Sequence, residues 1–291
     1  MIPPSLEPLE GGHSGETFRA EWDGAQAVVR IFANRSATRG HDAVDIDAAV
    51  LHLVRGLLPV PEVLEVRRPE PEAQLPALLV TSMLPGTRLD LVLLTASAEL
   101  RARIGASLGR ILTRLSGMPF LNAGAFTTPR LSPEPWPAPY TDLPTYLESL
   151  LADGLFGDWS PTERTALTSL AARSQDLLDP LQRACLVHSD FNPKNLLVDP
   201  ESGEVTGLLD WEFARAGLAV EDLGNLLRFD DEPVLTAAVL EHLDIPEASD
   251  VGLLLEQAQA ADLWALLNLA SRREENPVAA RAHDLLRERV G

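Results

Sequence analysis

Residues 186–199 read Leu-Val-His-Ser-Asp-Phe-Asn-Pro-Lys-Asn-Leu-Leu-Val-Asp, and the rest of the chain is interpreted from this stretch. It places His188, Asp190 and Asn195 at the spacing H-x-D-x-x-x-x-N. Apolar residues follow the polar loop, and another apolar run ends in Gly207-Leu-Leu-Asp-Trp211. Short apolar runs bounded by turn residues predict strands, so we expect a hairpin with polar side chains at its open end.

This spacing is typical of a kinase catalytic loop, in which the aspartate accepts a hydroxyl proton and the asparagine holds a magnesium ion. We therefore expect Asp190 to be the catalytic base. Asn195 and Asp210 offer the oxygen ligands that magnesium prefers, so we expect them to bind the metal. An ordinary turn between strands would explain a lone H-x-D, but it does not explain the whole set of residues.

Three neighbours of this motif have expected roles. Lys194 is the only lysine among 24 basic residues. It is close enough in sequence to approach the transferred phosphate, or it points to solvent. His188 is expected to support the loop, since Asp190 already takes the position of the base. Asp222 is expected to brace the loop through backbone N–H groups, or it is simply an acid at the start of a helix.

The first 82 residues are expected to form a small sheet with one helix. Asp23-Gly24 is a strong signal for a two-residue hairpin turn. Residues 42–56 carry apolar side chains at helical spacing. Met83-Leu-Pro-Gly86 predicts a turn and a hinge. Beyond the hinge the periodicity is helical, so we expect two domains, residues 1–82 and residues 83–291.

A loop of little bulk precedes the hairpin and could cradle nucleotide phosphates with its backbone N–H groups, or it is only a tight turn. It consists of Gly11, Gly12, His13, Ser14 and Gly15. Arg30 lies on the strand after the hairpin, where a kinase places a phosphate-binding lysine. Asp47 holds the matching place on the helix, so we expect an Arg30–Asp47 pair. Alternatively, Arg30 is a surface residue.

The bulk properties restrict the class of protein. The chain has 291 residues, 45% of them apolar, and a formal charge of −19. Such a surface repels nucleic acid and anionic lipid, so we expect neither as a partner. It suits a cationic substrate, or it only favours solubility. The single cysteine, Cys185, excludes an internal disulfide, and the N-terminus has no signal-peptide pattern. A cytoplasmic monomer or homodimer fits these properties.

Taken together, Val187-His-Ser-Asp-Phe-Asn-Pro-Lys-Asn195, Leu208-Leu-Asp-Trp211 and Glu221-Asp-Leu223 resemble the aminoglycoside phosphotransferase family of small-molecule kinases. The resemblance implies an α+β, bilobal, protein-kinase-like fold with a β-rich N-lobe and a mainly helical C-lobe. It implies ATP (or GTP) between the lobes, with Mg²⁺. It also implies an adenine-facing hinge formed by Ser82, Met83 and Leu84. Two positions depart from the family pattern. Ser189 stands where many members have glycine, and Arg30 stands where many have lysine.

The substrate is less well defined by the sequence than the reaction is. Proline-rich residues 117–140 predict a long loop or lid. Acidic and aromatic residues in the helical part suit a polycationic ligand, or they form a solvated acidic face. The candidates for substrate contact are Asp153, Asp158, Trp159, Trp211, Glu212, Asp230 and Asp231.

These observations favour a kinase that phosphorylates a hydroxyl of a cationic antibiotic and so gives resistance. A tuberactinomycin peptide such as capreomycin or viomycin, or an aminoglycoside, is the expected substrate. The first alternative is a metabolic kinase of the choline, homoserine or sugar type. The second is a nucleotide-binding scaffold without catalysis, which the missing lysine at position 30 would allow.

Overall fold

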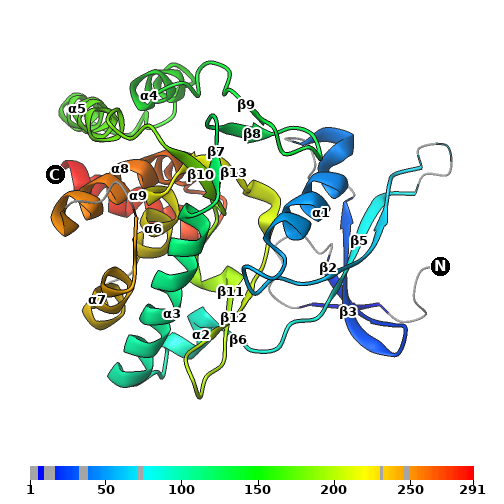
Figure 1. Cartoon of the computed structure of the whole chain (residues 1–291). Coiled ribbons are helices and arrows are strands. Elements are labelled where there is room, and N and C mark those ends of the chain that lie inside the picture. The colour runs from blue at the N-terminus through cyan, green and yellow to red at the C-terminus, as the bar shows by residue number, and fades with distance from the viewer. Residues whose placement is uncertain are drawn as a thin grey trace.

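The computed structural model describes residues 6–9, 17–32, 39–70, 72, 75–229, 232–245 and 250–291. The glycine loop 11–15 lies outside these residues, as do Asp230 and Asp231. Figure 1 shows a sheet at the N-terminal end of the chain and a larger, mostly helical part. The predicted α+β class is therefore confirmed.

The N-terminal sheet is antiparallel, with strand order β1-β2-β3-β5-β4. Its strands are β1 (Glu7–Pro8), β2 (Thr17–Trp22), β3 (Ala25–Phe32), β4 (Val63–Arg67) and β5 (Ala77–Ser82). The predicted hairpin turn is confirmed. Asp23 and Gly24 both have positive φ, 50° and 79°, as the tightest hairpin turn requires. The predicted helix is α1 (Ala43–Val54), which lies between this sheet and the helical part (Figure 1).

The predicted catalytic hairpin is confirmed as β11 (Leu196–Val198) and β12 (Val205–Leu208). A third strand, β6 (Thr87–Arg88), pairs with β11, so the segment after the hinge lies directly beside the hairpin. Short 3-10 turns precede β11 at Pro193–Asn195 and follow β12 at Trp211–Phe213. The polar ends of the hairpin are thereby held close to the hinge.

The proline-rich segment does not form the single long loop that we predicted. It contributes three short strands to a second antiparallel sheet of order β7-β10-β13-β8-β9. These strands are β7 (Pro119–Phe120), β8 (Gly124–Phe126), β9 (Pro133–Glu134), β10 (Ala184–Val187) and β13 (Arg215–Leu218). Pro119 and Pro133 are the first residues of β7 and β9, where a missing N–H costs little. The segment is paired with β13, which follows Asp210 in the chain.

Helices make up most of the remaining chain. They are α2 (Leu89–Leu93), α3 (Ala98–Ser116), α4 (Leu143–Ala152), α5 (Pro161–Leu178), α6 (Val220–Leu227), α7 (Pro233–Glu241), α8 (Val251–Ala270) and α9 (Pro277–Val290). Five of them begin at a side chain that accepts a backbone N–H three residues on, which satisfies an unpaired donor of the first turn. These caps are Ser97, Asp142, Ser160, Asp250 and Asn276. No helix of the described residues is both long and apolar enough to span a membrane.

The main hydrophobic core is continuous from α1 to α9. A second, small cluster lies in the N-terminal sheet and contains Ala20, Ala27, Val29, Leu78 and Val80. Helix α1 packs on β4 and β5 of the sheet and also contacts the 3-10 turn Trp211–Phe213 of the helical part. The hydrogen bond from Leu208 N to Pro59 O, 2.8 Å, joins the same two parts behind the hinge.

Candidate active site

Asp190 lies in the loop between β10 and the 3-10 turn, and two asparagine side chains bind its carboxylate. Asn195 Nδ2 donates to Asp190 Oδ2 at 2.6 Å, and Asn192 Nδ2 donates to Asp190 Oδ1 at 2.8 Å. These two amide donors hold the carboxylate of Asp190 in a fixed orientation. Asn192 was not predicted, although it lies between the two motif residues and caps the 3-10 turn by accepting Lys194 N at 3.0 Å.

The expected bracing of this loop is confirmed. The buried carboxylate of Asp222 accepts His188 N and Ser189 N, both at 2.8 Å. These bonds hold Ser189 at a φ of 67°, a left-handed conformation that strains a residue with a side chain. Burial raises the pKa of Asp222, while the His188 side chain and the two N–H donors oppose this effect.

His188 supports the loop, as predicted. Its Nε2 lies 2.9 Å from Leu209 O, and its Nδ1 accepts Asp190 N at 3.3 Å. Both ring nitrogens of His188 are therefore engaged in hydrogen bonds. The ring also packs on Trp211, with 4.6 Å between the ring centroids. Histidine thus links the loop of Asp190 to the strand that leads into Asp210.

Asp210 follows β12, directly beyond the end of the hairpin. Leu209 N donates to Asn195 O at 2.9 Å, so the two expected metal-binding residues project from neighbouring positions. Asp210 has a φ of 65°, a left-handed value typical of a residue held for function. Asn195 donates through Nδ2, which leaves its Oδ1 for a cation. Among the described residues no group of three or more histidine, cysteine or acidic side chains could hold a metal. A magnesium ion would therefore complete its shell with water and phosphate oxygens, as it commonly does.

Arg30 faces residues 210–214, which we call the metal loop because they include the expected metal ligand Asp210. Its Nη1 donates to Asp210 Oδ1 at 2.8 Å, its Nη2 pairs with Glu212, and it lies 4.0 Å from Asp47. The structure thus brings Arg30 and Asp47 together at the limit of ion-pair distance. Burial lowers the pKa of Arg30, but the carboxylates of Asp210, Glu212 and Asp47 outweigh it and raise the pKa above its usual value.

The close partner of Asp47 is Arg39, which the sequence did not reveal. Arg39 Nη1 lies 2.5 Å from Asp47 Oδ1, and Asp47 is 3% exposed. Burial raises the pKa of Asp47, although Arg39 and Arg30 both favour the carboxylate. Arg39 lies outside any motif, because the segment ahead of the helix has no fixed spacing to its partners.

Two residues expected to contact substrate have other roles next to Asp210. Trp211 is 3% exposed, and its Nε1 donates to Leu208 O at 3.1 Å. Its ring fills the core beside His188, so the prediction of a substrate contact is corrected for Trp211. Glu212 lies on the side of Arg30, where it balances that cation. Burial and the nearby Asp210 raise the pKa of Glu212.

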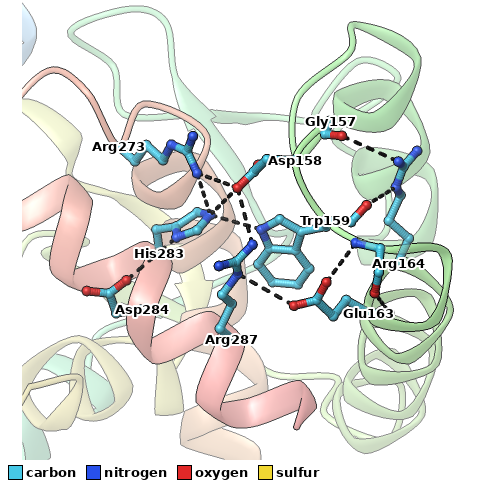
Figure 2. Close-up of polar contacts among 10 residues, drawn as sticks. Gly157, Asp158, Trp159, Glu163, Arg164, Arg273, His283, Asp284 and Arg287 are labelled. Atoms are coloured by element: carbon cyan, nitrogen blue, oxygen red, sulfur yellow. Dashed lines mark hydrogen bonds and ion pairs between the residues drawn. The ribbon is translucent and has the colours of Figure 1, made fainter.

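The structure also gives other roles to the expected substrate residues between α4 and α5. Figure 2 shows Trp159 enclosed between α5 and α9; it is 1% exposed, and its Nε1 donates to His283 Nε2 at 2.9 Å. Asp158 pairs with Arg273 at 2.5 Å and with Arg287 at 3.2 Å. These contacts hold α9 in place and leave Trp159 no exposed face for a ligand. Asp153 is exposed and ends α4.

The hinge residues join β5 to β6. Ser82 N donates to Glu62 O at 2.8 Å, and Met83 N donates to Gln26 O at 3.3 Å. Leu84 lies against Gly207 of the catalytic hairpin, where a Cβ would be only 2.9 Å from its Cδ1. Lys194 is exposed beside Asn195. Their expected contacts with a nucleotide stay predictions.

A further group of residues borders the catalytic loop on the side of β13. Arg215 donates to Ser189 Oγ and pairs with Glu221. The exposed Trp136 ring lies over this guanidinium, 5.8 Å away. The register explains the contact, since Arg215 pairs with Ala125 and Ala125 pairs with Glu134. Neither Trp136 nor Arg215 was among the site residues expected from the sequence.

Comparisons with known proteins agree with this geometry. Residues 5–248 match the phosphotransferase enzyme family. APH(2")-IIIa in its GDP and kanamycin complex superposes with a TM-score of 0.69 at 18% identity, covering 99% of this chain and 94% of that one. Choline kinase LicA from Streptococcus pneumoniae superposes with a TM-score of 0.61 at 19% identity, covering 98% and 93%.

One curated protein also matches, acyl-CoA dehydrogenase family member 11 from Mus musculus. It is 32% identical over 82 residues, or 28% of this chain, and the chain spans about a tenth of that protein's length, 10%. The solved structures share the protein-kinase-like fold of this chain. Because the family match covers most of the sequence, the chain belongs to the phosphotransferase enzyme family.

Proposed function

We propose that the protein transfers the γ-phosphate of ATP or GTP to a hydroxyl of a cationic small molecule. One observation carries the proposal. The Asp190 carboxylate is held by Asn195, and the backbone of Asn195 is bonded to the residue before Asp210. This arrangement supports a base at Asp190 and oxygen ligands at Asn195 and Asp210, the groups that phosphoryl transfer requires.

Each candidate residue would have its own role in the reaction. Asp190 accepts the hydroxyl proton as the substrate oxygen forms its bond to the γ-phosphorus and the bond to the β-phosphate oxygen breaks. Asn195 and Asp210 would hold Mg²⁺, which neutralises charge on the phosphates when bound. Arg30 would bind phosphate oxygens, and Lys194 would approach the transferred group. A cytoplasmic location, where nucleoside triphosphates are available, is part of the proposal.

A cationic antibiotic is the leading substrate class. A structural neighbour was solved with kanamycin, and the charge of −19 favours a cation. Two of the acidic residues expected to bind a cationic acceptor, Asp158 and Glu212, are already engaged in ion pairs with arginine. They are therefore less suited to binding a cationic substrate. That observation favours the second candidate, a metabolic kinase of the choline, homoserine or sugar type, and another neighbour is a choline kinase.

Nucleotide consumption with a panel of acceptors separates these functions. Purified protein is supplied with Mg²⁺, ATP or GTP, and each of an aminoglycoside, capreomycin, choline, homoserine and a sugar. A mass gain of one phosphate on an antibiotic supports the first candidate, and turnover of choline, homoserine or a sugar alone supports the second. No turnover with nucleotide still bound would instead support a scaffold.

Asp190→Asn tests the assignment of the base in the same assay. Loss of a positioned base lowers kcat by about 10²–10⁴-fold. Nucleotide affinity should be retained, because the substitution leaves Asn195, Asp210 and Arg30 in place. Unchanged turnover in Asp190→Asn would overturn the assignment.

A further inference from the structure

Arg39 makes the most extensive set of contacts of any residue outside the expected motifs near the site. Its side chain is 9% exposed. Besides the ion pair with Asp47 on α1, its Nη2 donates to Ala214 O at 2.5 Å and its Nη1 lies 3.4 Å from Trp211 O. One guanidinium therefore connects α1 to both ends of the 3-10 turn that follows Asp210.

These contacts have a consequence for Arg30. In a kinase, the acid on the helix pairs with the phosphate-binding cation. Here Asp47 is 2.5 Å from Arg39 and 4.0 Å from Arg30. The helix acid is thus mainly neutralised by Arg39, and Arg30 extends instead toward Asp210 and Glu212. The planar, five-donor guanidinium of Arg39 suits this role, since it serves a carboxylate and two carbonyls at once.

We propose that Arg39 is a positioning residue for phosphoryl transfer. It holds the backbone of residues 211–214 against α1, which fixes Asp210 where it can bind the metal. By neutralising Asp47, it also leaves Arg30 to pair with Asp210 and Glu212 beside the expected metal site. The inference rests on the proposed nucleotide site, but it concerns a different property, the location of the metal loop relative to α1.

Three variants of the full chain test the proposal. Arg39→Ala removes all the contacts, and Arg39→Lys keeps a charge for Asp47 but not the fork that reaches Ala214 O. Arg68→Ala is the matched control, because Arg68 also pairs with an acid of α1, Asp45 at 2.8 Å, but lies away from the metal loop. Each variant is measured for MgATP affinity and for hydrogen–deuterium exchange, with thermal stability as a reference.

Removal of a residue that orients metal ligands typically costs 10–100-fold in affinity or activity. We expect Arg39→Ala to weaken MgATP binding by about that factor and to speed amide exchange across residues 209–216. Arg39→Lys should recover thermal stability while MgATP binding stays weakened. Arg68→Ala should bind MgATP within about twofold of the parent chain, since exposed ion pairs contribute little.

Two outcomes would overturn the proposal. In the first, amide exchange across residues 209–216 and MgATP binding are the same in Arg39→Ala as in Arg68→Ala. The other is full recovery of both by Arg39→Lys, which would show that only the charge matters; if Arg39→Ala does not fold, this variant alone decides. Failure of the proposed function is a separate result. A parent chain that binds no nucleotide would refute that function, while the exchange of residues 209–216 would still test Arg39.

Discussion

Asp190, in the loop after β10, and Asp222, on α6, show at the scale of single residues how environment separates the roles of two aspartates. Asp190 is held by two side-chain amides at the surface of the loop. Asp222 is 2% exposed and accepts two backbone N–H groups. The strained φ values of Ser189 and Asp210 lie on either side of this network. Such strain persists only where neighbouring bonds over-determine it, so Asp222 is the residue that maintains the shape of the loop.

Asp222→Asn should therefore damage both stability and turnover. An amide keeps one acceptor but turns a donor toward a backbone N–H, and a buried unsatisfied group costs about 1–3 kcal/mol. Urea unfolding and kcat measure the two effects. Asp199→Asn is the control, because Asp199 also accepts two backbone N–H groups, from Glu201 and Ser202, in an exposed turn. An equal loss in the two variants would contradict the assigned role.

The residues that the sequence located and those it missed differ in the range of their contacts. Asp190 and Asn195 lie five residues apart in one loop, so spacing alone predicted them. Arg39, which was missed, contacts the backbone of Trp211 across 172 positions. Arg30 was predicted, but its contact with Asp210, across 180 positions, was not. Spacing within a segment carries no information about such long-range contacts. Burial depends on long-range contacts too, so Trp159 and Trp211 were predicted to contact substrate although the fold buries them.

At the scale of elements, local chemistry determined what could be predicted. Helix starts were foreseeable because capping side chains act within one turn, as Ser160 and Glu163 do in a reciprocal pair. The strands β7–β9 were not, because their pairing partners lie far along the chain. Proline content correctly excluded helices from this segment, but it could not reveal edge strands.

The crossing of α6 and α8 leads to a prediction about Gly224. A Cβ there would overlap the Ala258 carbonyl, so Gly224→Ala must push α6 away from α8. Overpacking of this kind costs about 1–3 kcal/mol, and the shift would carry Asp222 away from the catalytic loop. We expect lower stability in urea together with lower kcat. Gly252→Ala, in the exposed first turn of α8, is the control and should be neutral or slightly stabilising.

The docking of α9 should depend on pH through His283 (Figure 2). Burial and Arg273 lower the pKa of His283, against the opposing effect of Asp158, and its Nε2 accepts the Trp159 N–H. A histidine whose folded pKa is depressed stabilises the protein above about pH 6.5, and this contribution is lost as the pH falls through the folded pKa. Tm should therefore drop on acidification.

His283→Phe should remove part of that dependence, because phenylalanine cannot titrate. It should also lower stability at pH 7.5 by about 1–3 kcal/mol, since the buried Trp159 N–H loses its acceptor. Thermal unfolding from pH 7.5 to 5.5 measures both effects. His52→Gln, an exposed position on α1, should leave the pH dependence as it is. A pH profile unchanged by His283→Phe would show that other groups govern the acid sensitivity.

At the scale of the whole molecule, the proposed domain boundary in the sequence does not coincide with a boundary of the main hydrophobic core. We propose the boundary after Ser82, where β5 ends and the hinge begins. The main core nevertheless includes α1, residues of β5 and the helices of the C-terminal part, while β2, β3 and other residues of β5 form a small cluster of their own. The hydrogen bonds Leu208–Pro59 and Arg114–Leu57 also join the two parts.

Two matched substitutions distinguish these cores. Val50 on α1 is 0% exposed in the main core, and Val29 on β3 is 2% exposed in the small cluster. Either Val→Ala change should cost about 1–3 kcal/mol locally, because each removes a fully buried side chain's methyl groups. Hydrogen–deuterium exchange should rise in Val50→Ala across α1 and the helical part, since the molecule loses stability as one unit there. In Val29→Ala the increase should be confined to β2, β3 and β5, because local opening follows the contacts of the affected cluster. Identical exchange maps for the two variants would mean that the main core and the small sheet cluster unfold as a single cooperative unit.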